Sequence, residues 1–229
     1  MKRSEINKIM REAVNFLEEN NFFLPKFAYW SLKEWKMKGD EIQEIVENKL
    51  GWDITDYGSG NFAKKGLIHF TIRNGNPKNL VKGGKSYCEK IMIIEENQLT
   101  NLHHHKKKIE DIINRGGGIL IIELYNSTKD DKLDNTLVTI SVDGTKKKLK
   151  AGSKIELGPG ESITLTPLNY HRFWVKKGYG KVLIGEVSNV NDDYKDNIFL
   201  EETKRFTEIE EDEAPLYLLS DDYKKYLKI

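Results

Sequence analysis

Residues 101–118 read NLHHHKKKIEDIINRGGG and hold three of the five histidines of the protein. Residues two apart on a β-strand point to the same face, so His103 and His105 share a face and His104 points away. Glu110 follows in IEDII, which has the pattern of a second strand, and a glycine turn closes the segment. Two imidazoles and a carboxylate from the neighbouring strand predict most of a metal site. The plainer alternative is an exposed polar run before a lysine run.

His171, in TPLNYHRFWV, is the candidate for a fourth ligand, on a predicted strand that is entered through Pro167. Alone, it would be interpreted as a core or surface histidine. Together with His103, His105 and Glu110 it becomes the expected closing ligand. Mixed nitrogen and oxygen ligands suit Mn, Fe, Co, Ni or Zn better than Ca or Mg.

The composition limits the class of protein. A length of 229 residues, with 38% hydrophobic and 32% charged residues, suits one globular domain. The formal net charge of +1 gives no electrostatic case for binding nucleic acid or an anionic membrane. We expect the lysine runs 106–108 and 146–148 to be solvated turns. A single cysteine, Cys88, fits a reducing compartment, and no apolar run is long enough to span a membrane. The expected location is the cytoplasm.

The chain begins with helical patterns and continues with strand patterns. Residues 4–20 have the apolar spacing of an amphipathic helix, with Ser4 as its N-cap. We expect residues 1–50 to be largely helical and to pack on a β-barrel formed by residues 51–199. A C-terminal arm, residues 200–229, completes a single unit.

Many short strands separated by glycine turns favour a mainly β sandwich or closed barrel. The pair Asp143-Gly144, between NTLVTISV and TKKKLKAG, is a strong hairpin signal. The stretch GWDITDYGSGNF, residues 51–62, is expected to be rich in turns and carries Asp53 and Asp56.

The histidine pattern resembles the cupin superfamily. Its first motif has two histidines one residue apart, a glutamate and a glycine, matched here by His103, His105, Glu110 and Gly117. Asn97 stands where a preceding glycine is expected. The second motif is matched by Gly160, Pro167 and His171, while Leu168 and Val175 replace its second glycine and its closing asparagine. The resemblance implies a double-stranded β-helix, a small jelly-roll barrel with the metal inside.

A narrower resemblance extends over nearly the whole chain. GWDITDYGSGNF, HHHKKKIEDIINRGGG and GEVSNVNDDYKDNIF are similar to the D-lyxose isomerase family. Membership implies isomerisation of D-lyxose to D-xylulose, and often of D-mannose to D-fructose, with Mn²⁺ or a similar divalent ion (Co²⁺, Fe²⁺, Ni²⁺ or Zn²⁺). It also implies a homodimer and a metal held by His103, His105, Glu110 and His171.

Such an isomerisation moves a proton between two sugar carbons through an enediolate, so it needs an acid or base beside the metal. Lys90 shares a strand face with apolar residues, where a lysine is unfavourable without a task; the alternative is an edge-strand lysine. Glu186 shares a face with Val182 and Ile184, and its alternative is a surface glutamate. We expect Lys90 and Glu186 to be catalytic, with Glu202 as the rival carboxylate.

Sugar recognition needs fixed polar groups at the mouth of the barrel. The loop VNDDYKDN offers Asp193, and Arg205 could cover the same mouth. We expect these two to bind substrate, although an ordinary Asn/Asp turn explains most of that loop. The competing functions are another metal-dependent cupin, either a phosphosugar isomerase or an iron dioxygenase, and a non-catalytic sugar-binding cupin.

Overall fold

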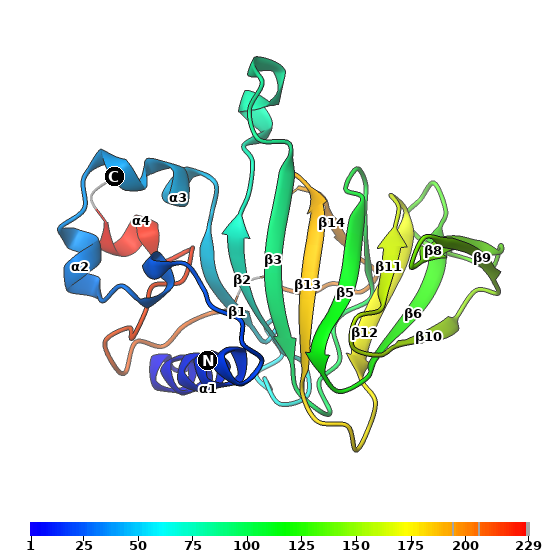
Figure 1. The fold of residues 1–229 in the computed structure, drawn as a ribbon, viewed down its shortest axis with the longest axis horizontal. Coiled ribbons are helices and arrows are strands. Elements are labelled where there is room, and N and C mark those ends of the chain that lie inside the picture. Colours follow the sequence, from blue (N-terminus) through cyan, green and yellow to red (C-terminus); the bar gives the residue numbers. More distant parts are fainter. Residues whose placement is uncertain (194, 206, 228–229) are drawn as a thin grey trace.

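The protein consists mainly of β-strands, with helices on one side, in a computed structural model that describes residues 1–193, 195–205 and 207–227. The strands form two antiparallel sheets that curl to face each other (Figure 1). This architecture confirms the predicted cupin barrel with an N-terminal helical segment. Within the described residues, no helix is long and apolar enough to cross a membrane.

Each sheet has a simple order. The larger sheet contains, in spatial order, β1 (Gly51–Thr55), β2 (Leu67–Arg73), β3 (Tyr87–Ile94), β13 (Val182–Asn189), β5 (Glu110–Gly117), β11 (Ser162–Leu165), β8 (Val138–Val142) and β9 (Thr145–Leu149). The smaller sheet contains β10 (Ser153–Leu157), β6 (Leu120–Ser127), β12 (Asn169–Val175), β4 (His103–His105) and β14 (Asn197–Phe199), and β7 (Leu133–Asp134) pairs with β6.

One apolar core fills most of the space between the sheets. Ile112, Leu124 and Phe173, from β5, β6 and β12, are buried in it. β3 and β13 are hydrogen-bonded neighbours in the interior of the larger sheet, so neither is an edge strand. Polar side chains on the inner face of these two strands therefore line the interior of the barrel.

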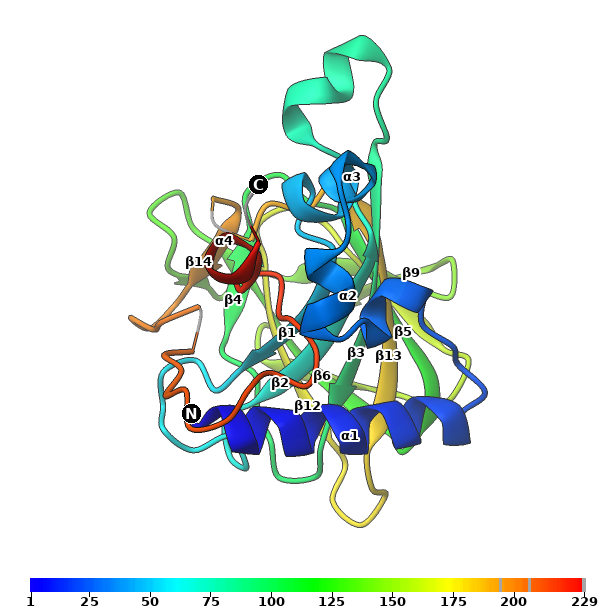
Figure 2. The same ribbon diagram turned by 90° about the vertical axis from the view of Figure 1, so that its left-hand side faces the viewer.

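The helices lie on one side of the larger sheet, where the first packs on the outer face and the others form a second apolar cluster (Figure 2). They are α1 (Arg3–Glu19), α2 (Leu32–Lys36), α3 (Gln43–Glu47) and α4 (Tyr223–Tyr226), with short 3₁₀ helices at η1 (Lys26–Tyr29), η2 (Asp40–Ile42) and η3 (Pro77–Lys82). Ile6 and Met10 of α1 are fully buried in the same cluster as Phe70 of β2.

The predicted N-cap at the chain start was wrong, and the predicted turn-rich stretch at residues 51–62 was right only after its first five residues. Helix α1 begins at Arg3, and Ser4 does not cap it, because Asp212 accepts hydrogen bonds from the Ser4 amide and hydroxyl. The stretch after Gly51 begins as a fully buried strand, because Trp52 packs edge-on against Phe70 under the helices. Turns begin only after this strand.

The predicted hairpin at Asp143-Gly144 is confirmed. Both residues have positive φ, 47° and 77°, which is the conformation of a two-residue hairpin turn. They join β8 to β9, with Val142 paired to Thr145. Lys146, Lys147 and Lys148 are exposed on β9, so this run is solvated but lies on a strand.

Candidate active site

Three histidines converge where β4 meets β12. His103 of β4 is the direct register partner of His171 of β12, and their ring centroids are 4.3 Å apart. His105 lies on the same face as His103, as predicted. A nitrogen of each of the three rings lies within 4.8 Å of the others. His104 points to the opposite face and contacts Tyr170.

Glu110, the first residue of β5, adds a carboxylate to these rings. Its Oε1 lies 3.3 Å from His105 Nε2 and 3.1 Å from His171 Nε2. His171 Nδ1 lies 3.1 Å from the carbonyl of Asn169, and His103 Nδ1 lies 2.9 Å from that of Asn101. A carbonyl can only accept, so both Nδ1 atoms carry a proton, and in a neutral ring this leaves the Nε2 lone pair to face the cavity.

The histidines and Glu110 together fit a divalent cation. The Nε2 lone pair of His171 faces the Glu110 carboxylate, and Glu110 Oε1 has no hydrogen-bond donor among the described residues. Burial, and then the neighbouring imidazoles, hold the pKa of His103 well below its usual value, so this ring is neutral and can ligate. Buried oxygen and nitrogen lone pairs that face one another are favourable only with positive charge between them, which a bound divalent cation would supply. We call His103, His105, His171 and Glu110 the metal end of the site.

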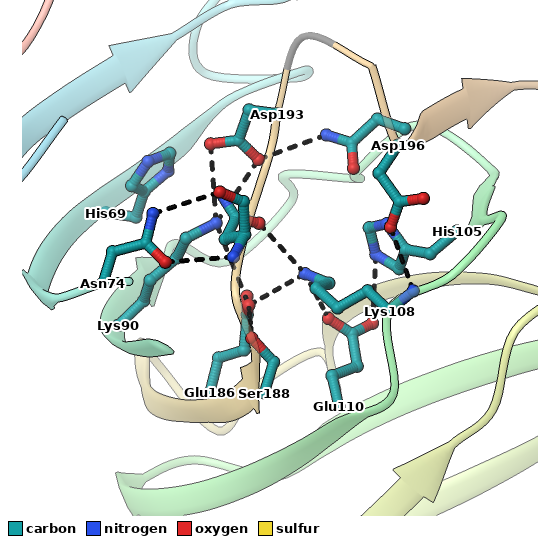
Figure 3. A network of polar contacts seen from close by, with 12 residues as sticks. His69, Asn74, Lys90, His105, Lys108, Glu110, Glu186, Ser188, Asp193 and Asp196 are labelled. Carbon is teal, nitrogen blue, oxygen red and sulfur yellow. Dashed lines mark hydrogen bonds and ion pairs between the residues drawn. The ribbon is translucent and has the colours of Figure 1, made fainter. Parts of the chain in front are cut away.

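Lys108 lies beside the metal end, which corrects the prediction that residues 106–108 form a solvated turn. Lys106 and Lys107 are exposed, but only 3% of the Lys108 side chain is. Its Nζ lies 2.7 Å from Glu110 Oε2 and 2.8 Å from Glu186 Oε1 (Figure 3). Burial would raise the pKa of Glu110, but the Lys108 ammonium holds it well below its usual value.

Lys90 and Glu186 face each other on neighbouring strands. They are register partners in β3 and β13, and each is 4% exposed. Lys90 Nζ lies 3.8 Å from Glu186 Oε1 and 3.3 Å from Asp193 Oδ1. Burial opposes ionisation of Glu186, but Lys108 and then Lys90 lower its pKa, so the carboxylate is charged.

Alternating charges continue away from the metal end. Arg205 Nη2 lies 3.3 Å from Asp193 Oδ2 and 3.0 Å from Asp53 Oδ2. Asp53 also lies 3.3 Å from His69 Nε2. We call the series Lys108, Glu186, Lys90, Asp193, Arg205 and Asp53 the ion-pair row. Burial lowers the pKa of His69 to about 4, so that imidazole is neutral beside the row.

One cavity joins the two groups. It is lined by all four residues of the metal end and by five of the ion-pair row, namely Lys108, Glu186, Lys90, Asp193 and Arg205, together with His69. A second cavity of about 210 Å³ shares His69 and Asp193 with the first. Glu202, the rival carboxylate, is exposed and does not line the first cavity.

Sequence reasoning missed three residues of this site. Lys108 precedes Glu110 by two positions, the spacing that places side chains on one strand face, but it was grouped with its exposed neighbours. Asp53 and His69 are register partners in β1 and β2. An alternating reading of LIHFTIR would have put His69 among inward residues, whereas the pairing with Asp53 required the fold.

Comparisons with known proteins find relatives along nearly the whole chain. The family model described as D-lyxose isomerase matches residues 1–223. The D-lyxose/D-mannose isomerase of Serratia proteamaculans is 47% identical over 230 residues, covering 99% of this chain and 100% of the relative. That of Escherichia coli O157:H7 is 44% identical over 227 residues, covering 99% and 100%.

Solved structures show the same fold at low identity. An L-ribose isomerase mutant of Acinetobacter sp. DL28 has a TM-score of 0.62 at 16% identity, covering 92% of this chain and 98% of that one. The L-ribose isomerase of Cellulomonas parahominis has a TM-score of 0.61 at 13% identity, with the same coverage. The match of the family model along the chain and the two close relatives show that this chain belongs to the D-lyxose isomerase family and is an aldose–ketose isomerase.

Proposed function

We propose that the protein interconverts D-lyxose with D-xylulose, and D-mannose with D-fructose. The names of the two relatives support these sugars. Converting a 2-hydroxy aldehyde to a ketose moves one hydrogen from C2 to C1 and one hydroxyl proton from O2 to O1. An enediolate lies between the two sugars, so the site must hold a base beside C2 and C1 and stabilise negative charge.

The observation that carries the proposal is the ionised carboxylate of Glu186, buried between two lysines in the cavity that the metal end also lines. Glu186 would take the proton from C2 and return it to C1. Lys90, 3.8 Å from Glu186, would supply the positive charge beside the sugar oxygens and exchange their proton. These two interior groups favour an isomerase over a non-catalytic sugar-binding cupin.

The four residues of the metal end would hold the ion, Mn²⁺ by preference, with Co²⁺, Fe²⁺, Ni²⁺ or Zn²⁺ as substitutes. When bound, a divalent ion supplies an electrophile that polarises sugar oxygens. Asp193 and Arg205 would bind the hydroxyls farther from the reacting carbons. Their mutual contact, at 3.3 Å, offers both an acceptor and donors at one place.

One assay tests the function. The protein is stripped with a chelator, each divalent ion is restored in turn, and D-lyxose, D-mannose and glucose 6-phosphate are supplied. We expect ketose from the first two sugars only when an ion is restored. Conversion of glucose 6-phosphate alone would contradict the proposal and favour a phosphosugar isomerase.

We further propose that the chain works as one cupin unit and as a homodimer in the cytoplasm. The family resemblance supports the dimer, and Tyr87 and Val187 of adjacent strands β3 and β13 expose apolar surface. The presence of one cysteine, the buried Cys88, supports a reducing compartment, because disulfide-stabilised proteins carry several. Light scattering at micromolar concentration should give twice the mass of the chain; a monomeric mass would rule out the dimer.

A further inference from the structure

Lys108 occupies an unusual position for the third lysine of an exposed run. Only 3% of its side chain is exposed, whereas Lys106 and Lys107 beside it face solvent. Taking an ammonium out of water is unfavourable by several kcal/mol unless charged partners and hydrogen bonds replace the solvent. Lys108 has such partners, and they are the carboxylates of Glu110 and Glu186.

The contacts of Lys108 use all its hydrogens. An ammonium has three N–H donors, and Nζ of Lys108 has three acceptors, Glu110 Oε2 at 2.7 Å, Glu186 Oε1 at 2.8 Å and Asn191 Oδ1 at 3.4 Å. The side chain therefore links β5, β13 and the loop that follows β13, and Figure 3 shows its contacts with Glu110 and Glu186. None of its hydrogens remains for a substrate.

Lys108 contacts only one oxygen of each of its two carboxylate partners, Glu110 and Glu186. It binds Oε2 of Glu110, while Oε1 faces the histidines. It binds Oε1 of Glu186, which also accepts the hydroxyl of Ser188 at 3.2 Å. In the described part of the chain, both of these hydrogen bonds to Glu186 fall on one oxygen, which leaves Oε2 for a proton of the substrate.

We propose that Lys108 is a positioning residue that ties the base Glu186 to the metal ligand Glu110. It fixes which oxygen of Glu110 faces the metal end and which oxygen of Glu186 acts as the base. The inference rests on the proposed isomerisation. Because a displacement of about 1 Å of a reacting group can cost 10²-fold in rate, a free Glu186 would be a much poorer base.

The first test is a double-mutant cycle on D-lyxose isomerisation with Mn²⁺ restored. Lys108→Met should lower kcat by about 10²-fold and change KM little, because the three donors of Lys108 are already used by protein acceptors. The double variant Lys108→Met/Glu186→Gln should lose much less than the product of the two single losses, because most of the effect of Lys108 on the rate passes through Glu186. Lys107→Met, the exposed neighbour, is the control and should match wild type.

The second test does not depend on activity. The visible absorption spectrum of bound Co²⁺ should change in Lys108→Met, because the freed Oε2 of Glu110 alters the ligand set, and should stay unchanged in Lys107→Met. If Lys108→Met fails to fold because Glu110 and Glu186 then repel each other, the spectrum is recorded on Lys108→Met/Glu186→Gln. This double variant loses one positive and one negative charge together.

Two results would overturn the inference. One is a loss of kcat in the double variant that equals the product of the two single losses, because Lys108 would then act independently of Glu186. The other is a Co²⁺ spectrum identical to that of wild type. A wild-type protein with no isomerase activity would instead overturn the proposed function, and the spectrum would still decide whether Lys108 positions Glu110.

Discussion

The metal end and the ion-pair row share one cavity but are built in different ways. The metal end takes three of its four residues from the single segment that contains β4 and the start of β5. Its rings are held by backbone carbonyls, as at His103 and His171. The ion-pair row takes each residue from a different strand or loop and is held by opposite charges. Hydrogen bonds to carbonyls fix which ring nitrogen can bind a metal at the metal end. In the ion-pair row, neighbouring opposite charges keep the buried carboxylates and ammonium groups ionised.

This difference predicts that substitutions at the metal end will lower activity more than substitutions in the ion-pair row. Loss of a ligand at the metal end removes the ion and everything that the ion contributes. Loss of one residue of the ion-pair row should leave the ion bound and mainly slow the proton transfer. The following predictions test this contrast, from the largest expected effect to the smallest.

His171→Ala should abolish stoichiometric metal binding and lower kcat by about 10³-fold or more, since the ion contributes several kcal/mol to the transition state. Elemental analysis after dialysis measures the metal, and circular dichroism checks the fold. Full metal occupancy in His171→Ala would remove this histidine from the ligand set.

Glu186→Gln and Lys90→Ala should each lower kcat by about 10²- to 10⁴-fold, the usual contribution of a positioned acid or base, and should retain metal. Glu202→Gln serves as the matched control, because its carboxylate is exposed outside the cavity. Near-normal turnover in Glu186→Gln together with a loss in Glu202→Gln would move the base to Glu202.

His69 gives the ion-pair row a dependence on pH that concerns stability. Its pKa is about 4 in the folded protein and 6.5 as the ordinary value, because burial disfavours the imidazolium. Between these values the unfolded chain binds more protons, so the free energy of unfolding falls as the pH falls from 6.5 to 4. A shift of this size corresponds to about 3 kcal/mol.

Urea unfolding at pH 7 and pH 4.5, on wild type and on His69→Gln, measures that contribution. The loss of stability on acidification should be smaller in His69→Gln, which has no titrating ring but can still bind Asp53. An equal loss in both proteins would show that His69 is protonated in the folded state.

The same contrast explains what could be predicted from the sequence. Strand periodicity places His103 and His105 on one face, and Glu110 is expected beside them on the next strand of the same segment. His171 is added as the ligand that would complete the set, and the family motif agrees with it. Lys90 and Glu186 were found by the period of two in their strands. Their direct pairing could not be foreseen, because it depends on β13 lying next to β3 rather than next to its neighbour in sequence.

The failures also have physical causes. Lys108 looked like a solvated lysine because only the fold brings Glu186, from 78 positions away in sequence, to its ammonium. Ser4 looked like a helix cap because the competing Asp212 lies 208 positions away. In both cases a long-range carboxylate overrode a sound local expectation. The single-unit organisation of residues 1–50, 51–199 and 200–229 stays a prediction.

The most direct test of the account follows hydrogen from solvent into product. D-Lyxose is converted by the Mn²⁺-loaded protein in ²H₂O, and the D-xylulose is examined by NMR after many turnovers. Because Glu186 carries the proton from C2 while the enediolate is held, and the proton of a carboxylic acid can exchange with solvent in that interval, we predict deuterium at C1 of the ketose. A product with no deuterium at C1, even near equilibrium, would mean that hydrogen passes directly from C2 to C1 and would contradict the role of Glu186 as base.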